Sequence, residues 1–282
     1  MLEIKSLYKD YGDKKVLKGI SFSTKEGEIV SLLGSNGSGK TTTFKSILGL
    51  TDYEGRIRFN GKIINKKKIG YMPEERSLFY DCPIHKQLVL MGRLKGLKDA
   101  QIEASLEKWY KKTNTFDFKE KVPPQLSKGN QQKIQMIIAV LHNPDLIVLD
   151  EPWTGLDQSN IEIFQKILLE LKAKNKLIVL SSHQHQQVQE ICDRYLYLKD
   201  GNLIINVSKK TLLSDKHKVL EIEGDGNIFP NVKAIRKNNL VKMILSQEDT
   251  KKAMTLVMNN PQVMSFSQRP LTIRDLIELK TC

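Results

Sequence analysis

One stretch of eight residues near the N-terminus, from Gly34 to Thr41, constrains the fold of this chain more than any other. It reads Gly-Ser-Asn-Gly-Ser-Gly-Lys-Thr and matches the pattern G-x-x-x-x-G-K-[ST] at every required position. An apolar run at residues 29–33 precedes it and predicts a buried strand, while Phe44 and Ile47 follow it at a helical spacing. A strand, a glycine-rich loop and a helix in this order predict a loop whose main-chain N–H groups close around a polyphosphate.

The pattern gives individual roles to the residues of this loop. Lys40 is expected to reach the β and γ phosphates, and the hydroxyl of Thr41 is expected to hold Mg²⁺. An ordinary glycine-rich turn is the alternative, which the flanking strand and helix disfavour. The other predicted phosphate-binding residues are Gly34, Ser35, Asn36, Gly37, Ser38, Gly39 and Thr42.

The chain has 282 residues, enough for one large domain and a small one. Charged residues make up 27% and hydrophobic residues 40%, a balance typical of a folded, soluble chain. No apolar run approaches the ~20 residues that a bilayer span requires, and the first residues do not begin an apolar signal segment. We therefore expect any role at a membrane to require a partner.

The formal net charge of +13 leaves three interpretations of the surface open. Basic groups such as residues 66–68 and 209–210 would suit a nucleic-acid binder or a protein beside an anionic membrane leaflet. Aromatic residues do not alternate with them, which favours an ordinary solvated surface. Cys82, Cys192 and Cys282 match no zinc or disulfide spacing and fit a reducing cytosol; a reactive thiol at Cys282 is the alternative.

Two aliphatic runs, residues 146–149 and 177–180, are typical of central parallel strands covered on both faces. A helical pattern at residues 161–174 separates them. This alternation predicts an α/β core with right-handed crossovers.

Shorter patterns predict the elements around this core. Residues 56–59 and 62–64 flank Asn60-Gly61, whose residue types favour the positive φ angles of a tight hairpin turn. Apolar residues at helical spacing predict helix over residues 84–118, and Pro123-Pro124 ends it.

Residues 217–282 predict a small separate unit. Two strand-like runs flank residues 238–239 and predict a hairpin. Ser246 is expected to cap a helix, and Thr272 with Asp275 is expected to open a last short helix through a capping box.

A pair of acids, Asp150-Glu151, follows the first aliphatic run directly. A carboxylate where a buried strand ends can hold Mg²⁺ through water, and the next carboxylate can polarise an attacking water. Such a pair also arises as an ordinary solvated strand end; Pro152 and the phosphate-binding loop earlier in the chain favour the nucleotide role for Asp150 and Glu151.

A third segment, Leu126-Ser-Lys-Gly-Asn-Gln131, lies between these motifs. With them it makes residues 1–216 similar to the ATP-binding subunit of ABC transporters, whose signature is usually Leu-Ser-Gly-Gly-Gln. The resemblance implies ATP and Mg²⁺ as cofactors and an α/β fold. That fold is a P-loop NTPase of ABC type with a RecA-like core, an antiparallel β subdomain, an α-helical subdomain at about 78–142 and a small C-terminal α+β domain at 217–282.

In this family the signature loop contacts the γ-phosphate bound by a second ATP-binding subunit. The resemblance therefore implies a head-to-tail dimer, homodimer or heterodimer, with two ATP molecules in its interface. Ser127 would offer its hydroxyl and Gly129 an unobstructed N–H, just before a helix expected to begin near Gln131. Lys128 and Asn130 depart from the pattern; Lys128 either adds positive charge at the phosphate or is a solvated loop lysine.

The implied catalytic residues are Lys40, Glu151 and His183. Glu151 would be the general base, and His183, after the second aliphatic run, would contact the γ-phosphate and orient the water. Asp150 and Thr41 would hold the metal ion.

Three further residues take their roles from the resemblance. Asp157 matches the loop that links the two active sites, and Tyr11 matches the aromatic residue that stacks on adenine. For Tyr11 an exposed tyrosine on a turn is the alternative. Glu74 stands where most members carry glutamine, and we expect its carboxylate still to reach the metal region.

Residues 73–76, Pro-Glu-Glu-Arg, and the variant signature together resemble the export branch of the family, which includes sodium, antibiotic, drug and peptide exporters. The implied partner is a separate transmembrane permease with about six spans. One of its cytoplasmic helices would bind a groove near residues 79–97. The implied location is the cytoplasmic face of the cell membrane, and no nucleic-acid partner is expected.

Two other functions stay open. A soluble ABC ATPase could act on nucleic acid, ribosomes or an assembly scaffold, and the positive charge favours it. Having only one phosphate loop argues against translation-type relatives, and the short spacing between motifs argues against chromosome-type relatives. A catalytically idle regulatory cassette is the third class, and the complete set Lys40, Asp150, Glu151 and His183 argues against it.

Overall fold

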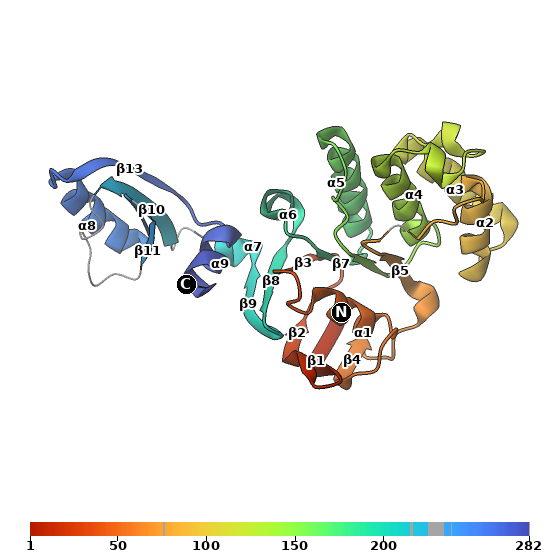
Figure 1. The fold of residues 1–282 in the computed structure, drawn as a ribbon, viewed down its shortest axis with the longest axis horizontal. Helices are drawn as coiled ribbons and strands as arrows, with labels where there is room; N and C mark the ends of the chain where they lie inside the picture. The colour runs from red at the N-terminus through yellow and green to blue at the C-terminus, as the bar shows by residue number, and fades with distance from the viewer. Residues whose placement is uncertain (76, 215–216, 225–233, 238, 282) are drawn as a thin grey trace. The chain divides into compact units, whose positions relative to one another are not determined.

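The computed structural model describes residues 1–75, 77–214, 217–224, 234–237 and 239–281. Contacts divide the chain into two units, Met1–Asn206 and Val207–Cys282 (Figure 1). The domain boundary between residues 216 and 217 stays a prediction from the sequence. Within the described ranges no helix is both long enough and apolar enough to cross a bilayer. Cys282, for which a reactive thiol is the alternative, lies outside those ranges.

A six-stranded sheet forms the centre of the first unit, in the order β5-β6-β7-β3-β8-β9. The pairs from β5 to β8 are parallel, and every residue of β6 and β7 is buried, which confirms the two predicted central strands. The six strands are β3 (Ile29–Gly34), β5 (Ile69–Met72), β6 (Leu146–Leu149), β7 (Leu177–Ser181), β8 (Arg194–Lys199) and β9 (Asn202–Ser208).

A second, antiparallel sheet lies beside it, with β1 (Leu2–Tyr11) between β2 (Lys14–Ser23) and β4 (Glu54–Phe59). One hydrophobic cluster joins both sheets and helix α1 (Lys40–Ile47). This core fixes the phosphate-loop helix between the two sheets. Its fully buried members include Leu2, Ile4, Leu7, Val30, Leu32, Phe44, Val148, Val179 and Leu196.

The predicted hairpin at residues 56–64 is wrong in its second strand. Asn60 and Gly61 do adopt positive φ angles of 50° and 74°. Residues 62–64, however, make a single bridge, between Phe59 and Lys62, although β4 is the outer strand of its sheet and pairs with β1 on one edge. That pairing buries Ile57 in the core, whereas Ile63 is 78% exposed and would gain nothing from a hairpin.

The helical segment predicted over residues 84–118 is also interrupted. It forms α2 (Ile84–Leu94), α3 (Asp99–Thr113) and a short 3₁₀ turn (Phe116–Phe118). Gly96, at φ 88°, turns the chain between the two helices. A second 3₁₀ turn, Pro123–Gln125, precedes α4 (Lys128–Val140), which begins three residues before the predicted start.

Helix α4 packs closely on the central sheet. A Cβ atom on Gly70 of β5 would collide with the carbonyl oxygen of Ala139 in α4, so only glycine permits this approach. The remaining helices of the first unit are α5 (Gln158–Ala173) and α6 (His185–Ile191), whereas α7 (Lys209–Leu212) lies in the second unit.

The described part of the C-terminal unit contains an antiparallel sheet and three helices, which confirms the predicted α+β fold of a small C-terminal domain. Its strands are β10 (His217–Gly224), β11 (Ala234–Lys237), β12 (Leu240–Ser246) and β13 (Val263–Pro270), in the order β11-β12-β10-β13. Besides α7, its helices are α8 (Gln247–Met258) and α9 (Ile273–Thr281). The β11–β12 pair confirms the predicted hairpin, although residue 238 of its turn lies outside the described ranges.

The two predicted helix caps of this unit are confirmed. Ser246 Oγ accepts a hydrogen bond from the Asp249 N–H at 3.1 Å. Thr272 and Asp275 form a reciprocal capping box, with N–H to side-chain oxygen distances of 3.0 and 3.3 Å.

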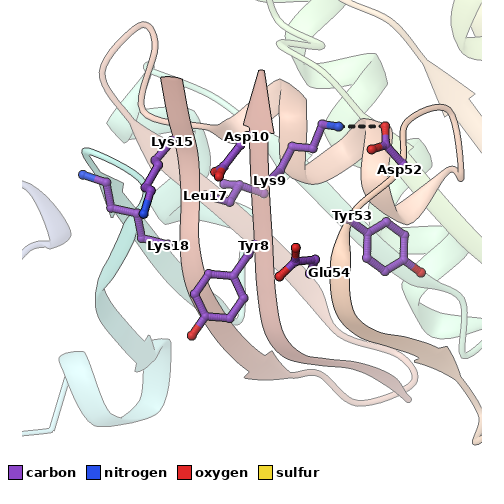
Figure 2. Close-up of a pocket in the computed structure, with 9 residues that line it drawn as sticks. All are labelled: Tyr8, Lys9, Asp10, Lys15, Leu17, Lys18, Asp52, Tyr53 and Glu54. Atoms are coloured by element: carbon purple, nitrogen blue, oxygen red, sulfur yellow. Dashed lines mark hydrogen bonds and ion pairs between the residues drawn. The ribbon is translucent and has the colours of Figure 1, made fainter. Parts of the chain in front are cut away.

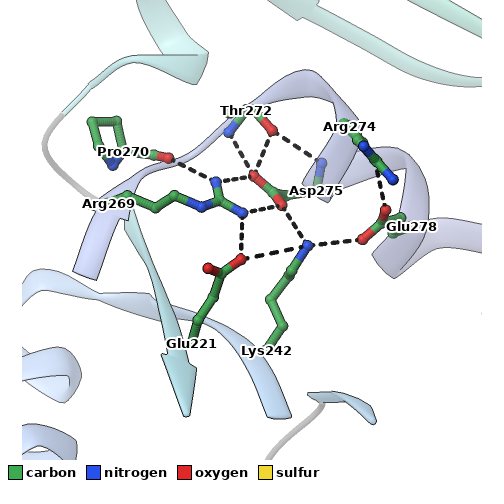
Figure 3. A network of polar contacts seen from close by, with 8 residues as sticks. All are labelled: Glu221, Lys242, Arg269, Pro270, Thr272, Arg274, Asp275 and Glu278. Atoms are coloured by element: carbon green, nitrogen blue, oxygen red, sulfur yellow. Dashed lines mark hydrogen bonds and ion pairs between the residues drawn. The ribbon is translucent and has the colours of Figure 1, made fainter. Parts of the chain in front are cut away.

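Asp275 is also the centre of a charged network (Figure 3). Its side chain is 1% exposed and accepts hydrogen bonds from Arg269 at 2.7 and 2.8 Å and from Lys242 at 3.2 Å. Burial alone would raise the pKa of Asp275, but the hydrogen bonds from Arg269 and Thr272 lower it well below its ordinary value. The network therefore stabilises the ionised carboxylate and ties α9 to β12 and β13.

Replacing Asp275 by Asn should lower the free energy of unfolding of the C-terminal unit by about 3 kcal/mol, because the partly buried Arg269 and Lys242 lose their charge-assisted hydrogen bonds to this carboxylate and keep only their other carboxylate partners. Native-state hydrogen exchange of the amides in β13 measures this change. Since the pKa is lowered in the folded state, the advantage of wild type should be complete above about pH 5 and should shrink as the pH falls toward the folded pKa. Glu248→Gln breaks an exposed ion pair with Lys252 and should change stability by less than about 0.5 kcal/mol. Equal effects of the two variants would contradict the prediction.

Candidate functional site

The glycine-rich loop connects β3 to α1 as the sequence predicts. Gly39 precedes the helix with φ 109°, a conformation that favours glycine. Lys40 is largely buried, and its Nζ donates hydrogen bonds to the carbonyl oxygens of Gly34 at 2.8 Å and Ser35 at 3.2 Å. The ammonium group is therefore held over the loop by the loop's own backbone.

A cavity of about 620 Å³ opens beside this loop. It brings together residues from β1, β2, the loop, the end of β5, the end of β6 and the segment after β7. Most of the predicted site residues therefore meet in one place. The lining residues are Tyr11, Lys14, Val16, Asn36, Gly37, Gly39, Lys40, Thr41, Thr42, Glu74, Asp150, Glu151 and His183.

Sequence reasoning missed Lys14 and Val16. Both lie on β2, which turns back against β1, and Lys14 pairs with Tyr11. The short turn between β1 and β2 could have indicated both residues, because the pairing of these strands places Lys14 opposite Tyr11, which was predicted.

Asp150 follows β6 and is 1% exposed. Its Oδ1 accepts a hydrogen bond from Ser181 Oγ at 2.5 Å, while its Oδ2 is buried without a hydrogen-bond partner. A buried carboxylate oxygen without a donor is costly unless a cation or water satisfies it. Asp150 therefore has the chemistry of a metal ligand.

Glu151 is 5% exposed and has a positive φ of 49°, which is uncommon for a residue other than glycine. Its N–H donates to Ser181 Oγ at 2.9 Å. Its Oε2 lies 3.0 Å from Nδ1 of His183 and accepts a longer hydrogen bond, 3.4 Å, from the His183 N–H. The acid and the histidine thus lie within direct reach of each other, as a base and its orienting partner require.

Tyr11 and Glu74 lie at the exposed rim of this cavity. The Tyr11 ring is 47% exposed, and Lys9 Nζ lies 4.8 Å from its centroid. Burial raises the pKa of the neighbouring Tyr71 to about 12, with smaller contributions from the charges of Asp150 and Glu74. The carboxylates of Asp150 and Glu74 are therefore both close enough to Tyr71 to affect its pKa.

Six predicted residues do not line this cavity: Gly34, Ser35 and Ser38 of the phosphate loop, and Ser127, Gly129 and Asp157. Ser127 Oγ caps α4 by accepting from the Asn130 N–H at 3.3 Å, and Asp157 Oδ1 caps α5 by accepting from the Asn160 N–H at 2.9 Å. That hydrogen bond lowers the pKa of Asp157. A Cβ on Gly129 would lie 3.3 Å from the carbonyl oxygen of Gly155, so the signature segment contacts the loop that leads to α5.

A second cavity of about 570 Å³ lies on the antiparallel sheet (Figure 2). Its lining mixes cations and carboxylates, and Lys9 is already paired with Asp52 at 2.7 Å. None of the residues that line it belongs to the phosphate loop or to the acid pair, which distinguishes it from the first cavity. Its residues are Tyr8, Lys9, Asp10, Lys15, Leu17, Lys18, Asp52, Tyr53 and Glu54.

Fold and site together define a P-loop nucleotide-hydrolysing cassette. Residues 17–154 match the family model described as ABC transporter. The chain is 44% identical over 204 residues to an uncharacterized ABC transporter ATP-binding protein of Methanocaldococcus jannaschii, a match that covers 72% of this chain and 76% of the relative. It is 32% identical over 235 residues to the Nod factor export ATP-binding protein I of Burkholderia orbicola, covering 79% and 76%. The chain therefore belongs to the ATP-binding subunits of ABC transporters and is an ATPase.

Solved structures agree with this assignment. The ATP-binding subunit of an ABC transporter superposes with a TM-score of 0.71 at 30% identity, covering 75% of this chain and 91% of that one. A dimeric bacterial ABC transporter cassette superposes with a TM-score of 0.69 at 26% identity, covering 74% and 99%. The predicted ABC-type fold is thereby confirmed.

Replacing Gly34 by Ala should disturb the phosphate loop. An added Cβ would lie 2.5 Å from the carbonyl oxygen of Leu198 and would also collide with Ser38 Oγ, so the loop must shift. We expect at least about a tenfold loss of ATP affinity, which corresponds to roughly 1.4 kcal/mol, measured by equilibrium nucleotide binding. Gly96→Ala is the control, because Gly96 also has positive φ but meets no atom within 4 Å and lies outside the cavity. Unchanged affinity in Gly34→Ala would contradict the prediction.

Proposed function

We propose that this chain is the ATP-hydrolysing motor subunit of a membrane exporter, with MgATP bound in the cavity beside the phosphate loop. The observation that carries the proposal is the convergence of Lys40, Asp150, Glu151 and His183 on that one cavity. The loop would bind the phosphates through its N–H groups and Lys40.

The cavity residues fit a Mg²⁺ ion held mainly by the nucleotide. In the part of the chain that the structure describes, no three His, Cys, Asp or Glu side chains gather into a metal site of their own. Magnesium at nucleotides is usually bound by one or two carboxylates, waters and phosphates. Asp150 Oδ2, the Thr41 hydroxyl and the nearby Glu74 supply this incomplete set.

Glu151 would accept the proton of the attacking water, and His183 would hold both the Glu151 carboxylate and the γ-phosphate. The 3.0 Å separation of His183 Nδ1 and Glu151 Oε2 supports this pairing. Because little covalent chemistry is needed for phosphoryl transfer, positioning and charge stabilisation would supply most of the catalysis.

A second ATP-binding subunit would complete the site. Ser127, Gly129 and Asp157 lie outside the cavity of their own chain, which supports their action on a nucleotide bound by a partner. The dimeric cassette of similar fold supports the same arrangement. ATP binding would close two subunits together, and hydrolysis would reopen them.

Export through a separate permease is supported by the names of relatives such as the Nod factor export protein. Exposed apolar side chains of Phe79, Leu90 and Leu94 lie in the region predicted to receive a permease helix. A small cavity of about 260 Å³ lies beside Leu94 and Met91. The chain would then act at the cytoplasmic face of the membrane.

Glu151→Gln should bind MgATP and dimerise but hydrolyse at least about a hundredfold more slowly, because it removes the proposed base. Steady-state phosphate release measures the rate, and size-exclusion chromatography with MgATP measures dimerisation. Glu162→Gln, which changes an exposed glutamate on α5, should leave both unchanged. Wild-type turnover in Glu151→Gln would remove Glu151 from the role of base.

The alternative is a soluble ATPase that acts on nucleic acid or a macromolecular assembly, a function compatible with the net charge of +13. The two functions differ in what stimulates hydrolysis. The membrane protein that co-purifies with this chain should raise its ATPase rate several-fold, whereas DNA and RNA should not, and Glu151→Gln should abolish the stimulated rate. Stimulation by nucleic acid alone would favour the alternative.

A further inference from the structure

Ser181 ends β7, and its side chain is completely buried between the two acids of the site. Its hydroxyl donates a hydrogen bond to Asp150 Oδ1 at 2.5 Å and accepts one from the Glu151 N–H at 2.9 Å. A serine hydroxyl has one donor proton, and here that proton is committed to a carboxylate. A single side chain therefore contacts the proposed metal-binding acid and the backbone of the proposed base.

Each of these two hydrogen bonds constrains the conformation of one of the acids. Holding Oδ1 of Asp150 sets the rotation of the carboxylate, which leaves Oδ2 as the oxygen without a partner. Holding the N–H of Glu151 supports a backbone at φ 49°, in the left-handed region that non-glycine residues seldom adopt. The Glu151 side chain then reaches His183 at 3.0 Å.

We propose that Ser181 is a positioning residue that sets Asp150 and Glu151 as one unit, so that one hydroxyl orients both the metal-binding oxygen and the base. This role rests on the proposed Mg²⁺-dependent ATPase function. It predicts that loss of the hydroxyl weakens metal-dependent nucleotide binding and turnover together, while nucleotide binding without metal is unaffected.

A purely structural serine would behave differently, and the same sheet offers one. Ser31 of β3 is also fully buried, but its Oγ donates to the carbonyl oxygen of Arg194 at 3.3 Å, on the neighbouring strand β8. The hydrogen bond of Ser31 thus goes to the backbone of a neighbouring strand and not to either acid. Ser31→Ala therefore matches Ser181→Ala in burial and in the atom removed.

The test measures ADP affinity of the full chain by calorimetry, once with Mg²⁺ and once with EDTA, and the kcat and KM of its ATPase activity. In Ser181→Ala the gain in ADP affinity on adding Mg²⁺ should fall about tenfold, since a hydrogen bond to a charged group is lost, and affinity in EDTA should be unchanged. The kcat should fall about tenfold or more with little change in KM. Ser181→Thr, which keeps the hydroxyl, should restore most of the metal-dependent gain, and Ser31→Ala should lower only the Tm.

Ser181→Cys decides the matter if Ser181→Ala does not fold, because the thiol keeps the side-chain shape but is a weak donor. A loss of the metal-dependent gain in this variant supports the role. If Ser181→Ala or Ser181→Cys retains the wild-type gain and kcat, the inference is overturned. If wild type itself shows no gain in ADP affinity with Mg²⁺, the proposed function fails instead, so the two failures are distinguishable.

Discussion

The site depends on one constraint, which is that neighbouring parallel strands end on the same side of the sheet. Strands β6, β7 and β3 are neighbours and pair in parallel register, with Leu149 opposite Leu180 and Leu32 opposite Ser181. Their carboxyl ends therefore open at one edge, where ligands of such sheets bind. The phosphate loop, the acid pair and the residues after β7 meet there because each directly follows one of these strands. The buried aliphatic side chains of the strands hold that register, and so hold the chemistry in place.

The sequence predicts this part of the molecule well because each feature is local. The loop motif, the two aliphatic runs and the acid pair can each be recognised from a few consecutive residues. Because the strands are parallel, the segments that follow them lie at the same end of the sheet. The caps at Ser246 and Thr272 are predictable for the same reason, since a cap depends on residues three positions apart. Tyr11 and Glu74 line the same cavity, and their roles at the adenine and the metal ion stay predictions from the family resemblance.

Features that depend on how a segment packs against the rest of the chain were not predictable. Asn60-Gly61 has the residues of a hairpin, but the residues after it make a single bridge to β4, and Ile63 is left exposed. The break at Gly96 depends on α3 packing against α2, which periodicity in a single window does not reveal. The contribution of Ser181 was missed because serine at a strand end has no pattern of its own. Only the position of its hydroxyl between two acids gives it a role.

Ser127 and Asp157 each cap a helix of their own chain. The geometry of these caps shows which hydrogen-bonding groups of the two side chains could still contact a second subunit. Ser127 uses one acceptor lone pair to cap α4, which leaves its donor proton free of that bond. A phosphate needs donors, so capping and phosphate contact by Ser127 do not compete. Asp157 differs, because an ionised carboxylate has only acceptors and its lowered pKa keeps it ionised. Asp157 would therefore accept hydrogen bonds from backbone N–H groups of a partner subunit or from water. Ser127 would instead donate a hydrogen bond to the nucleotide. The dimer proposed above requires this division of roles, and the caps already provide it.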